Sequence, residues 1–233
     1  MSGRVLGRVV RSSCTSALGL LLGASLMAPA ATAAPRDAAA CNGYVALTYD
    51  DGPNPSSTPA LLNALQAAGA KATFFTLGSR EQQYPDLLRR INQAGMTVGN
   101  HTWSHPHLTQ LGTSQVQQEI SSTQQITQQI IGRSPTLFRP PYGETNGTVQ
   151  NIARSQGLAQ VLWSVDSQDW NNASTDQIVA AAARAQAGGV VLMHDGYTTT
   201  VNAVSRIVRD LAARNLCPGV LVNRDGTAAV VAP

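Results

Sequence analysis

From Cys41 onward the chain alternates between short apolar runs and longer amphipathic segments. The apolar runs have the length and the β-branched content of buried strands, and Gly, Pro or polar residues bound them. The predicted strands cover 44–49, 72–77, 96–100, 136–139, 159–165, 188–193 and 219–222. The predicted helices cover 58–68, 85–94, 113–131, 145–156, 174–186 and 199–214.

The two longest predicted helices carry apolar residues on one arc at about 100° per residue. In the segment 113–131 the arc consists of Val116, Ile120, Ile126, Ile130 and Ile131. In the segment 199–214 it consists of Val201, Val204, Ile207, Val208 and Leu211. We therefore expect one face of each helix to pack against a sheet.

Strands that alternate with helices predict parallel βα units and an α/β fold. A (β/α) barrel with about seven parallel strands is the expected closure. A doubly wound open sheet is the alternative, but no glycine-rich phosphate-binding turn follows the first predicted strand. We find no linker and no internal repeat, so we predict a single domain over residues 41–233.

The first 33 residues do not follow this alternation. They open with three basic residues and no acidic one, namely Arg4, Arg8 and Arg11. An apolar run over 17–30 and the small residues 31–33 follow, which is the order of a secretory signal peptide. The alternative is an uncleaved membrane anchor, but the run is short and interrupted by proline. We expect 1–33 to be removed and the mature protein to be secreted, with no stable membrane insertion.

The charge balance changes once this leader is set aside. The whole chain has 16 Lys and Arg against 13 Asp and Glu, and three of the basic residues lie in the leader. The mature chain is therefore close to neutral, with no basic surface of the kind that binds nucleic acid. Its polar surface must consist largely of Gln, Asn, Ser and Thr, which suits a neutral polymer as partner.

Cys41 and Cys217 are the two cysteines outside the leader. An even number of cysteines in an exported protein predicts a disulfide, here between the two ends of the domain. Two buried free thiols are the alternative.

Clusters of polar residues follow five of the predicted strands, at 50–53, 101–105, 139–143, 166–170 and 194–196. In a (β/α) barrel the carboxyl ends of the strands meet at one face, where catalytic groups lie. The five clusters are therefore expected to form one site.

His101 and His105 are four residues apart, so a helical turn would place both rings on one side. Two imidazoles and one carboxylate make a common three-ligand metal site that keeps a position open for water. Two unrelated surface histidines are the alternative.

The adjacent Asp50 and Asp51 would repel each other unless a cation or an arginine compensates. A metal on one carboxylate and Arg139 beside the other would supply that compensation. The alternative is an ordinary Asp-Gly-Pro surface turn, which does not explain the doubled acid after a buried strand.

These segments resemble the five motifs of the polysaccharide deacetylases, which are carbohydrate esterase family four, or NodB-homology domains. The motifs read TYDDGP at 48–53, HTWSH at 101–105, RPPYG at 139–143, DSQDW at 166–170 and LMHD at 192–195. Their order agrees with that of the family, and the resemblance covers about 41–222. Further stretches resemble secreted bacterial acetylxylan esterases: HPHLTQLG at 105–112, LFRPPYGETN at 137–146 and VDSQDWNNASTD at 165–176.

The resemblance implies a deformed (β/α) barrel, with 41–233 as the catalytic domain, and a divalent metal, Zn²⁺ or Co²⁺. It implies that three residues bind this metal: Asp51, His101 and His105. Asp50 would then be the general base that takes a proton from the attacking water, and Arg139 would orient it.

The resemblance also assigns the remaining site residues. The backbone N–H of Tyr142 would stabilise the oxyanion, and Tyr142 would contact the substrate. His194 would be the general acid, kept basic by Asp169. Trp170 and Leu192 would line the pocket for the acetyl methyl group.

The expected function is metal-dependent removal of acetyl groups from a polysaccharide by a monomeric enzyme, with the O-acetyl groups of acetylated xylan as the substrate. N-deacetylation of chitin oligomers or peptidoglycan is the alternative. An inactive sugar-binding domain should lack Asp50 or a metal ligand, and export argues against a small-molecule amidase. His107 lies outside the matched pattern, and we predict a structural role or a place at the cleft rim.

Overall fold

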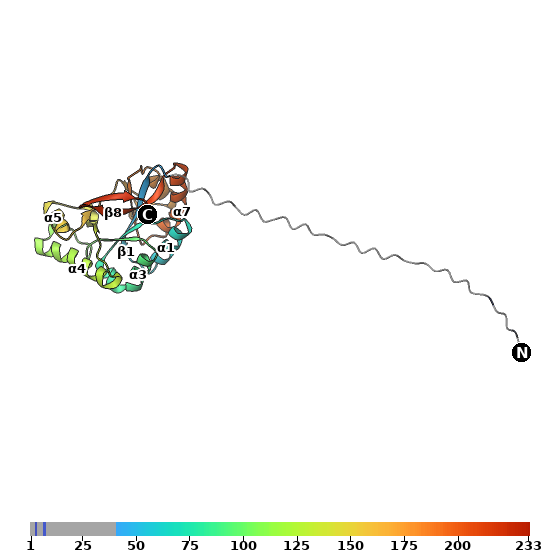
Figure 1. Cartoon of the computed structure of the whole chain (residues 1–233), viewed down its shortest axis with the longest axis horizontal. Coiled ribbons are helices and arrows are strands. Elements are labelled where there is room, and N and C mark those ends of the chain that lie inside the picture. Colours follow the sequence, from blue (N-terminus) through green and yellow to red (C-terminus); the bar gives the residue numbers. More distant parts are fainter. Residues whose placement is uncertain (1–2, 4–6, 8–40) are drawn as a thin grey trace. The chain divides into compact units, whose positions relative to one another are not determined.

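The computed structural model describes residues 41–233 together with Gly3 and Gly7. The predicted signal peptide therefore lies, apart from those two glycines, outside the described residues. In the described domain the strands occupy the centre and the helices lie around them (Figure 1). A search of the described residues finds no helix with the length and apolar character needed to span a membrane.

The domain contains nine strands and seven α-helices in the part of the chain that the structure describes. The strands are β1 (Tyr44–Gly52), β2 (Thr73–Thr76), β3 (Thr97–Asn100), β4 (Leu137–Phe138), β5 (Ala159–Gln160), β6 (Val165–Asp166), β7 (Val190–His194), β8 (Cys217–Arg224) and β9 (Thr227–Val231). The helices are α1 (Thr58–Ala67), α2 (Gly78–Gln83), α3 (Pro85–Gln93), α4 (Thr113–Ile131), α5 (Gly147–Ser155), α6 (Thr175–Ala182) and α7 (Thr198–Ala213). The sequence pattern did not predict α2 or β9.

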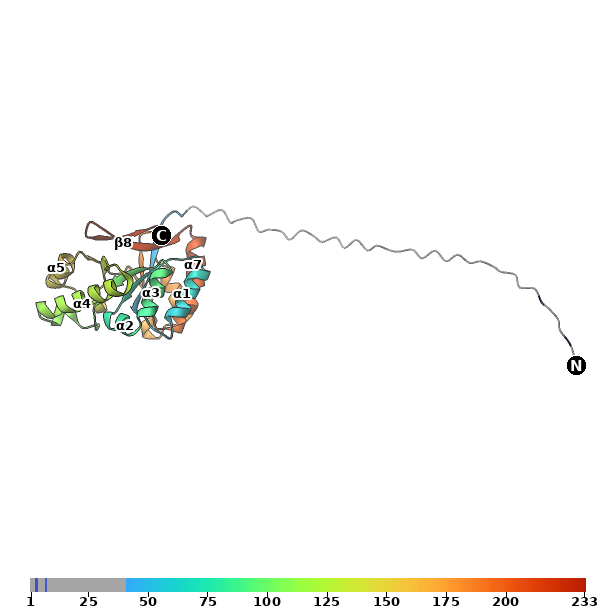
Figure 2. The same cartoon turned by 60° about the horizontal axis from the view of Figure 1, so that its bottom comes forward.

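Seven strands form a parallel sheet in the order β5-β4-β3-β2-β1-β7-β6, with β1 near its centre. Helices α1 to α4 lie on one side of these strands, and β8 lies on the other (Figure 2). The sheet curls nearly into a barrel, which confirms the predicted fold class.

The predicted strand 159–165 is wrong as a single element. Residues Ala159 and Gln160 pair with β4, whereas Val165 and Asp166 pair with β7. The residues between the two pairs cross from one edge of the sheet to the other. Because one short strand cannot pair with two separated edges at once, the barrel stays open between β5 and β6.

The predicted strand 219–222 belongs to a hairpin instead of a βα unit. Strand β8 pairs with the start of β1 and with the antiparallel strand β9. The Asn223 side chain donates hydrogen bonds to the carbonyls of Thr136 and Gly157, just before β4 and β5. The hairpin therefore lies at the amino-terminal ends of the strands and leaves their carboxyl ends for the site.

Strand β1 shows how the core orients the site. Its residues Val45, Leu47 and Tyr49 are fully buried in the cluster that includes residues of α1 and α7. Successive side chains of a strand point to opposite faces. Ala46 accordingly belongs to a separate cluster with residues of β2, β4 and β5. Thr48 and Asp50 follow Ala46 at the same period, so Asp50 reaches the carboxyl end of the barrel interior.

Cys41 and Cys217 form a disulfide, with their Cα atoms 5.6 Å apart. The predicted pairing is confirmed. The bond joins the residues before β1 to the start of β8, where Tyr44 lies opposite Cys217 in the sheet.

Candidate active site

Asp50 and Asp51 both line one cavity at the carboxyl ends of the strands. In a regular strand, neighbouring side chains would point to opposite faces. Asp51 instead has a φ of 69°, and the pairing of β1 with β2 shifts register between Asp50 and Gly52. This local irregularity brings the second carboxylate to the same cavity as the first.

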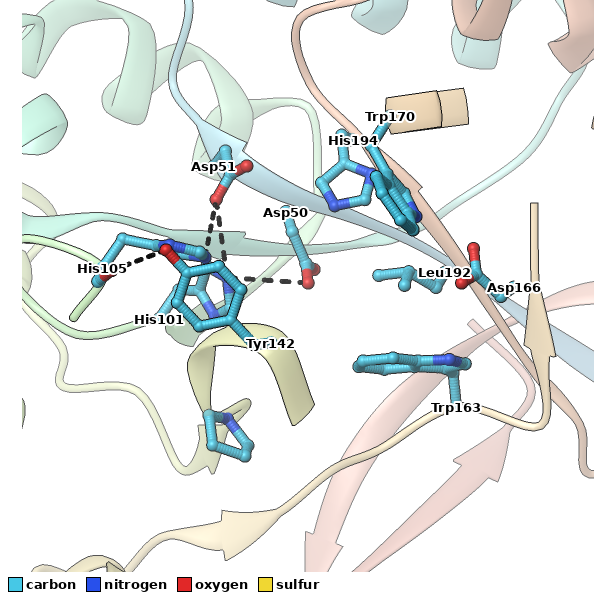
Figure 3. Close-up of a pocket in the computed structure, with 11 residues that line it drawn as sticks. Asp50, Asp51, His101, His105, Tyr142, Trp163, Asp166, Trp170, Leu192 and His194 are labelled. Carbon is cyan, nitrogen blue, oxygen red and sulfur yellow. Dashed lines mark hydrogen bonds and ion pairs between the residues drawn. The ribbon is translucent and has the colours of Figure 1, made fainter. Parts of the chain in front are cut away.

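Asp51 lies against two imidazoles. Its Oδ1 atom is 3.5 Å from Nε2 of His101 and 3.5 Å from Nε2 of His105. One ligand atom from each of the three side chains falls within 4.8 Å of the others. Figure 3 shows this group on one side of the cavity, with Asp50 between it and His194.

The two histidines meet through an irregular loop, so the expected helical turn is wrong. No helix covers residues 101–105, and Thr102 and His105 have left-handed backbone angles, with φ of 71° and 62°. The two rings nevertheless lie 5.0 Å apart between centroids. Glu119 on α4 holds the loop, because its carboxylate accepts hydrogen bonds from the N–H groups of Trp103 and Ser104. Nothing in the sequence pattern singled out Glu119.

The three side chains fit a divalent metal. Nδ1 of His101 lies 2.7 Å from the Arg139 carbonyl, so it carries the proton and leaves the Nε2 lone pair facing Asp51. Burial lowers the pKa of His101 to about 3, which keeps the ring neutral, as a ligand must be. Oδ1 of Asp51 is buried and has no hydrogen-bond partner. Two imidazoles and one carboxylate are also the donors of common zinc sites.

Asp50 is paired with a buried arginine. Nη1 of Arg139 donates to Oδ1 of Asp50 at 2.8 Å and to Oγ1 of Thr48 at 2.7 Å. The guanidinium also lies over the ring of Phe75, 4.2 Å from its centroid. Burial raises the pKa of Asp50, and the Arg139 charge opposes that shift. The predicted Asp50–Arg139 pair is present in the structure.

His194 faces Asp50 from the other side of the cavity, and Asp169 lies behind it. Nδ1 of His194 is 2.7 Å from Oδ1 of Asp169, whose Oδ2 accepts hydrogen bonds from the His194 N–H and from Thr200. Burial by itself would lower the pKa of His194. The hydrogen bond to Asp169 and the negative charge of Asp50 outweigh burial and raise that pKa to about 9. The imidazole is therefore protonated at neutral pH and can donate a proton.

The cavity has a volume of about 410 Å³, within the usual range for ligand sites. The predicted residues Tyr142, Trp170 and Leu192 line it, whereas Arg139 and Asp169 lie behind the wall. The rings of Tyr142 and Trp170 are half exposed, and Leu192 is buried.

Three lining residues were not among the predicted site residues: Pro140, Trp163 and Asp166. Trp163 and Asp166 fall where the sequence pattern predicted a continuous strand and its end, and the break in that strand brings both to the cavity. Pro140 and Asp166 lie within the matched motifs at 139–143 and 166–170. Their motif positions could therefore have identified them as lining residues.

The family model for polysaccharide deacetylases matches residues 37–161, more than half of the chain. With the fold and the site described above, this match establishes the chain as a member of the polysaccharide deacetylase family.

Solved structures and curated relatives agree with this family assignment. The chain is similar to a family 4 carbohydrate esterase from Streptomyces lividans solved in complex with acetate. The TM-score is 0.80 and the identity 52%, over 83% of this chain and 100% of that one. It is 45% identical to a bifunctional xylanase/xylan deacetylase of Cellvibrio japonicus, over 83% of this chain and 29% of the relative. It is 44% identical to a peptidoglycan-N-acetylmuramic acid deacetylase of Bacillus subtilis, over 72% of this chain and 35% of the relative. The chain thus spans about a third of the length of these two curated relatives.

Proposed function

We propose that this protein is a secreted, monomeric, metal-dependent esterase that removes O-acetyl groups from acetylated xylan. One observation supports the reaction type. The proposed general base, Asp50 with its partner Arg139, faces the proposed general acid, His194 with its partner Asp169, across the cavity. The three possible metal ligands lie beside them. Hydrolysis of an acetyl ester or amide needs a proton taken from water and a proton given to the leaving group.

Asp51, His101 and His105 would hold Zn²⁺ or Co²⁺. When bound, such a cation lowers the pKa of a water molecule and polarises the acetyl carbonyl. Asp50 would take the proton from the attacking water, and the 3.7 Å distance between its Oδ2 and Nε2 of His101 supports this role. Its hydrogen bond to Arg139 fixes the carboxylate in that orientation.

The tetrahedral intermediate carries a negative oxygen that requires a hydrogen-bond donor. Tyr142 lines the cavity, and no described residue accepts a hydrogen bond from its backbone N–H. This unpaired donor supports the predicted oxyanion role. Trp170 and Leu192 supply the apolar wall for the acetyl methyl group.

The leaving group is protonated by His194. Its ring carries a proton at neutral pH because Asp169 accepts the Nδ1 hydrogen, which leaves the Nε2 hydrogen for the sugar oxygen. An ester oxygen can leave before its protonation is complete, whereas an amide nitrogen must be protonated before it leaves as an amine. Ester hydrolysis should therefore be faster than amide hydrolysis wherever both substrates fit.

The assignment of acetylated xylan rests on the similarity to the xylan deacetylase of Cellvibrio japonicus and on the near-neutral mature chain. Half-exposed aromatic rings at the cavity also suit the flat faces of neutral sugars. N-deacetylation of peptidoglycan or chitin oligomers is the second candidate, which the similarity to the Bacillus subtilis enzyme favours. Secretion is supported by the disulfide, since such bonds persist in oxidising compartments.

The metal site predicts a loss of both bound metal and activity in Asp51→Asn, His101→Ala and His105→Ala. Bound zinc or cobalt is measured by elemental analysis after dialysis, and folding by circular dichroism. His107→Ala is the matched control and should retain the metal, because His107 is not part of the three-ligand group. Chelation should silence the wild type, and zinc or cobalt should restore it. Full activity of metal-free enzyme would rule out this mechanism.

The substrate is tested by initial rates of acetate release from acetylxylan, chitin oligomers and peptidoglycan at equal metal loading. We expect the highest rate on acetylxylan. Rapid release from chitin oligomers or peptidoglycan with none from acetylxylan would replace the esterase assignment with an N-deacetylase.

Mass spectrometry of the mature protein from the culture medium tests the proposed secretion, and analytical ultracentrifugation tests the proposed monomeric state.

A further inference from the structure

We propose that His107 and Glu144 are positioning residues, which hold the ring of Tyr142 so that its backbone N–H stays aimed at the developing oxyanion. This inference rests on the proposed function, in which the Tyr142 N–H is the oxyanion donor. Neither His107 nor Glu144 lines the cavity or belongs to the three-ligand group. Their effect on the reaction would therefore pass through Tyr142.

Tyr142 has a backbone conformation that needs support. Its φ is 59° and its ψ is 5°, in the left-handed region that residues with a Cβ atom avoid. Its side chain is 54% exposed, so burial in the core does not hold it in place. A residue persists in such a conformation only when its surroundings over-determine it.

Two imidazole rings supply that support. The ring of His107 lies parallel to the Tyr142 ring, with centroids 4.1 Å apart and an interplanar angle of 12°. The ring of His105 meets the Tyr142 ring edge-on, with centroids 4.5 Å apart and an angle of 69°. Tyr142 is thus held between a proposed metal ligand and a second histidine two residues further on.

His107 is itself fixed by Glu144. Nδ1 of His107 lies 3.2 Å and 3.1 Å from the two carboxylate oxygens of Glu144, and Thr109 donates a further hydrogen bond to Oε2 at 3.3 Å. Glu144 follows Tyr142 by two residues. The segment 142–144 is therefore fastened to the loop 105–109 twice, by ring stacking at Tyr142 and by hydrogen bonds at Glu144.

The expected consequence of losing the stack is a displaced N–H. Without the His107 stack the ring keeps only its contacts with His105. Tyr142 can then relax out of the left-handed region, and its N–H points elsewhere. A displacement of about 1 Å in a catalytic group can lower the rate by up to about a hundredfold. Substrate binding would change little, because the N–H is needed most when charge develops on the oxygen.

The test compares His107→Ala with His107→Phe on 4-nitrophenyl acetate, an ester too small to depend on a polysaccharide-binding surface. We expect His107→Ala to lower kcat about tenfold with KM within about twofold of the wild type. His107→Phe restores a flat ring without the imidazole nitrogens and should recover kcat to within about threefold. Zinc content is measured for each variant, so that a disturbed His105 is recognised.

Binding of methylphosphonate, a tetrahedral anion, supplies a readout other than turnover. Calorimetric titration of zinc-loaded His107→Ala should show a dissociation constant for methylphosphonate about tenfold weaker than that of the wild type. The constant for acetate, a planar anion, should be unchanged. If His107→Ala fails to fold, Glu144→Ala is the second variant. It frees the His107 ring from its carboxylate partner and should also lower kcat.

Several results would overturn the inference while the proposed function stands: wild-type kcat in His107→Ala, equal losses in His107→Ala and His107→Phe, or a raised KM with kcat preserved. The last result would make the stacked rings a substrate surface instead. Failure of the proposed function is recognised separately, because the wild type itself would then release no acetate, or its activity would not change when the metal is removed.

Discussion

The surroundings of two buried aspartates in this site shift their pKa values in opposite directions. Burial dominates at Asp50 and raises its pKa despite the pairing with Arg139. Burial also acts to raise the pKa of Asp169, but hydrogen bonds from His194 and Thr200 lower it overall. Asp50 is thereby suited to accept a proton, and Asp169 remains ionised to support a charged His194.

The pairing of His194 with Asp169 predicts a change in the pH profile. In Asp169→Asn the imidazolium loses its carboxylate partner, so the pKa of His194 should fall from about 9 by about one to three pH units. Since the acid must be protonated, kcat on a glycan acetate should decline as pH rises through that pKa. The alkaline limb of the profile should therefore move to lower pH.

Asp176→Asn is the matched control for this shift. Asp176 pairs with Arg206 at the surface, where its side chain is 81% exposed. The same change of carboxylate to amide there should leave the pH profile in place. An unmoved alkaline limb in Asp169→Asn would show that Asp169 does not tune the acid.

At the scale of elements, helix α4 departs from its predicted apolar stripe. Val116 and Ile120 are buried as expected, but Ile126, Ile130 and Ile131 are only partly buried. The fully buried positions in the second half of the helix are Thr123 and Thr127. The neighbouring helix α2 explains this, because it places the carboxylate of Glu81 within 2.6 Å of Oγ1 of Thr127.

Glu81 is a buried acid that pairs only with hydroxyl groups among the described residues. Thr76 and Thr127 each lie 2.6 Å from one of its oxygens. Thr127 is also 2.7 Å from the carbonyl of Thr123. Because a hydroxyl has one proton, a protonated Glu81 can donate to Thr127 while Thr127 donates to that carbonyl. Burial raises the pKa of Glu81 to about 7.

This raised pKa predicts a stability that depends on pH. The folded state binds the Glu81 proton more tightly than the unfolded state, so stability is highest below the ordinary pKa of 4.5 and falls as pH rises toward about 7. The loss from this group should reach about 3 kcal/mol. Urea unfolding between pH 4.5 and 7 should show this decline in the wild type and a much flatter dependence in Glu81→Gln. Equal slopes would mean that Glu81 ionises normally.

At the scale of the whole domain, the disulfide and the terminal hairpin close the end opposite the site. Cys41 and Cys217 are 176 residues apart in the chain. The bond fastens the entry to the central strand β1 onto β8, and β8 pairs with both β1 and β9. The seven-stranded sheet therefore has a fixed base beneath its open cavity.

Removal of this bond is expected to affect stability and leave catalysis intact. Closing so long a loop is worth about 5 kcal/mol in the chain-entropy model, and measured losses are about 2–5 kcal/mol. The double variant Cys41→Ser, Cys217→Ser should show a loss in this range on denaturant unfolding. Its kcat at 25 °C should remain that of the wild type, because both cysteines lie away from the cavity. An unchanged free energy of unfolding would contradict the stabilising role.

The sequence by itself determined the βα alternation, the fold class and the residues at the strand ends. These features follow from local properties: the period of apolar side chains selects strand or helix, and parallel strands bring their carboxyl ends together. The doubled acid and the pair of histidines also suggested a metal site, and the structure brings one ligand atom each from Asp51, His101 and His105 within 4.8 Å of the others.

Only the tertiary structure decided how those residues meet. The break of the predicted strand 159–165, the left-handed turns at Asp51 and Tyr142, and the stacking of His107 depend on partners far away in the chain. Arg139 reaches Asp50 across 89 residues of sequence, a contact that no local period encodes. Local patterns report which face of an element is buried. The distances within a site depend on how the elements pack, and packing is a property of the whole domain.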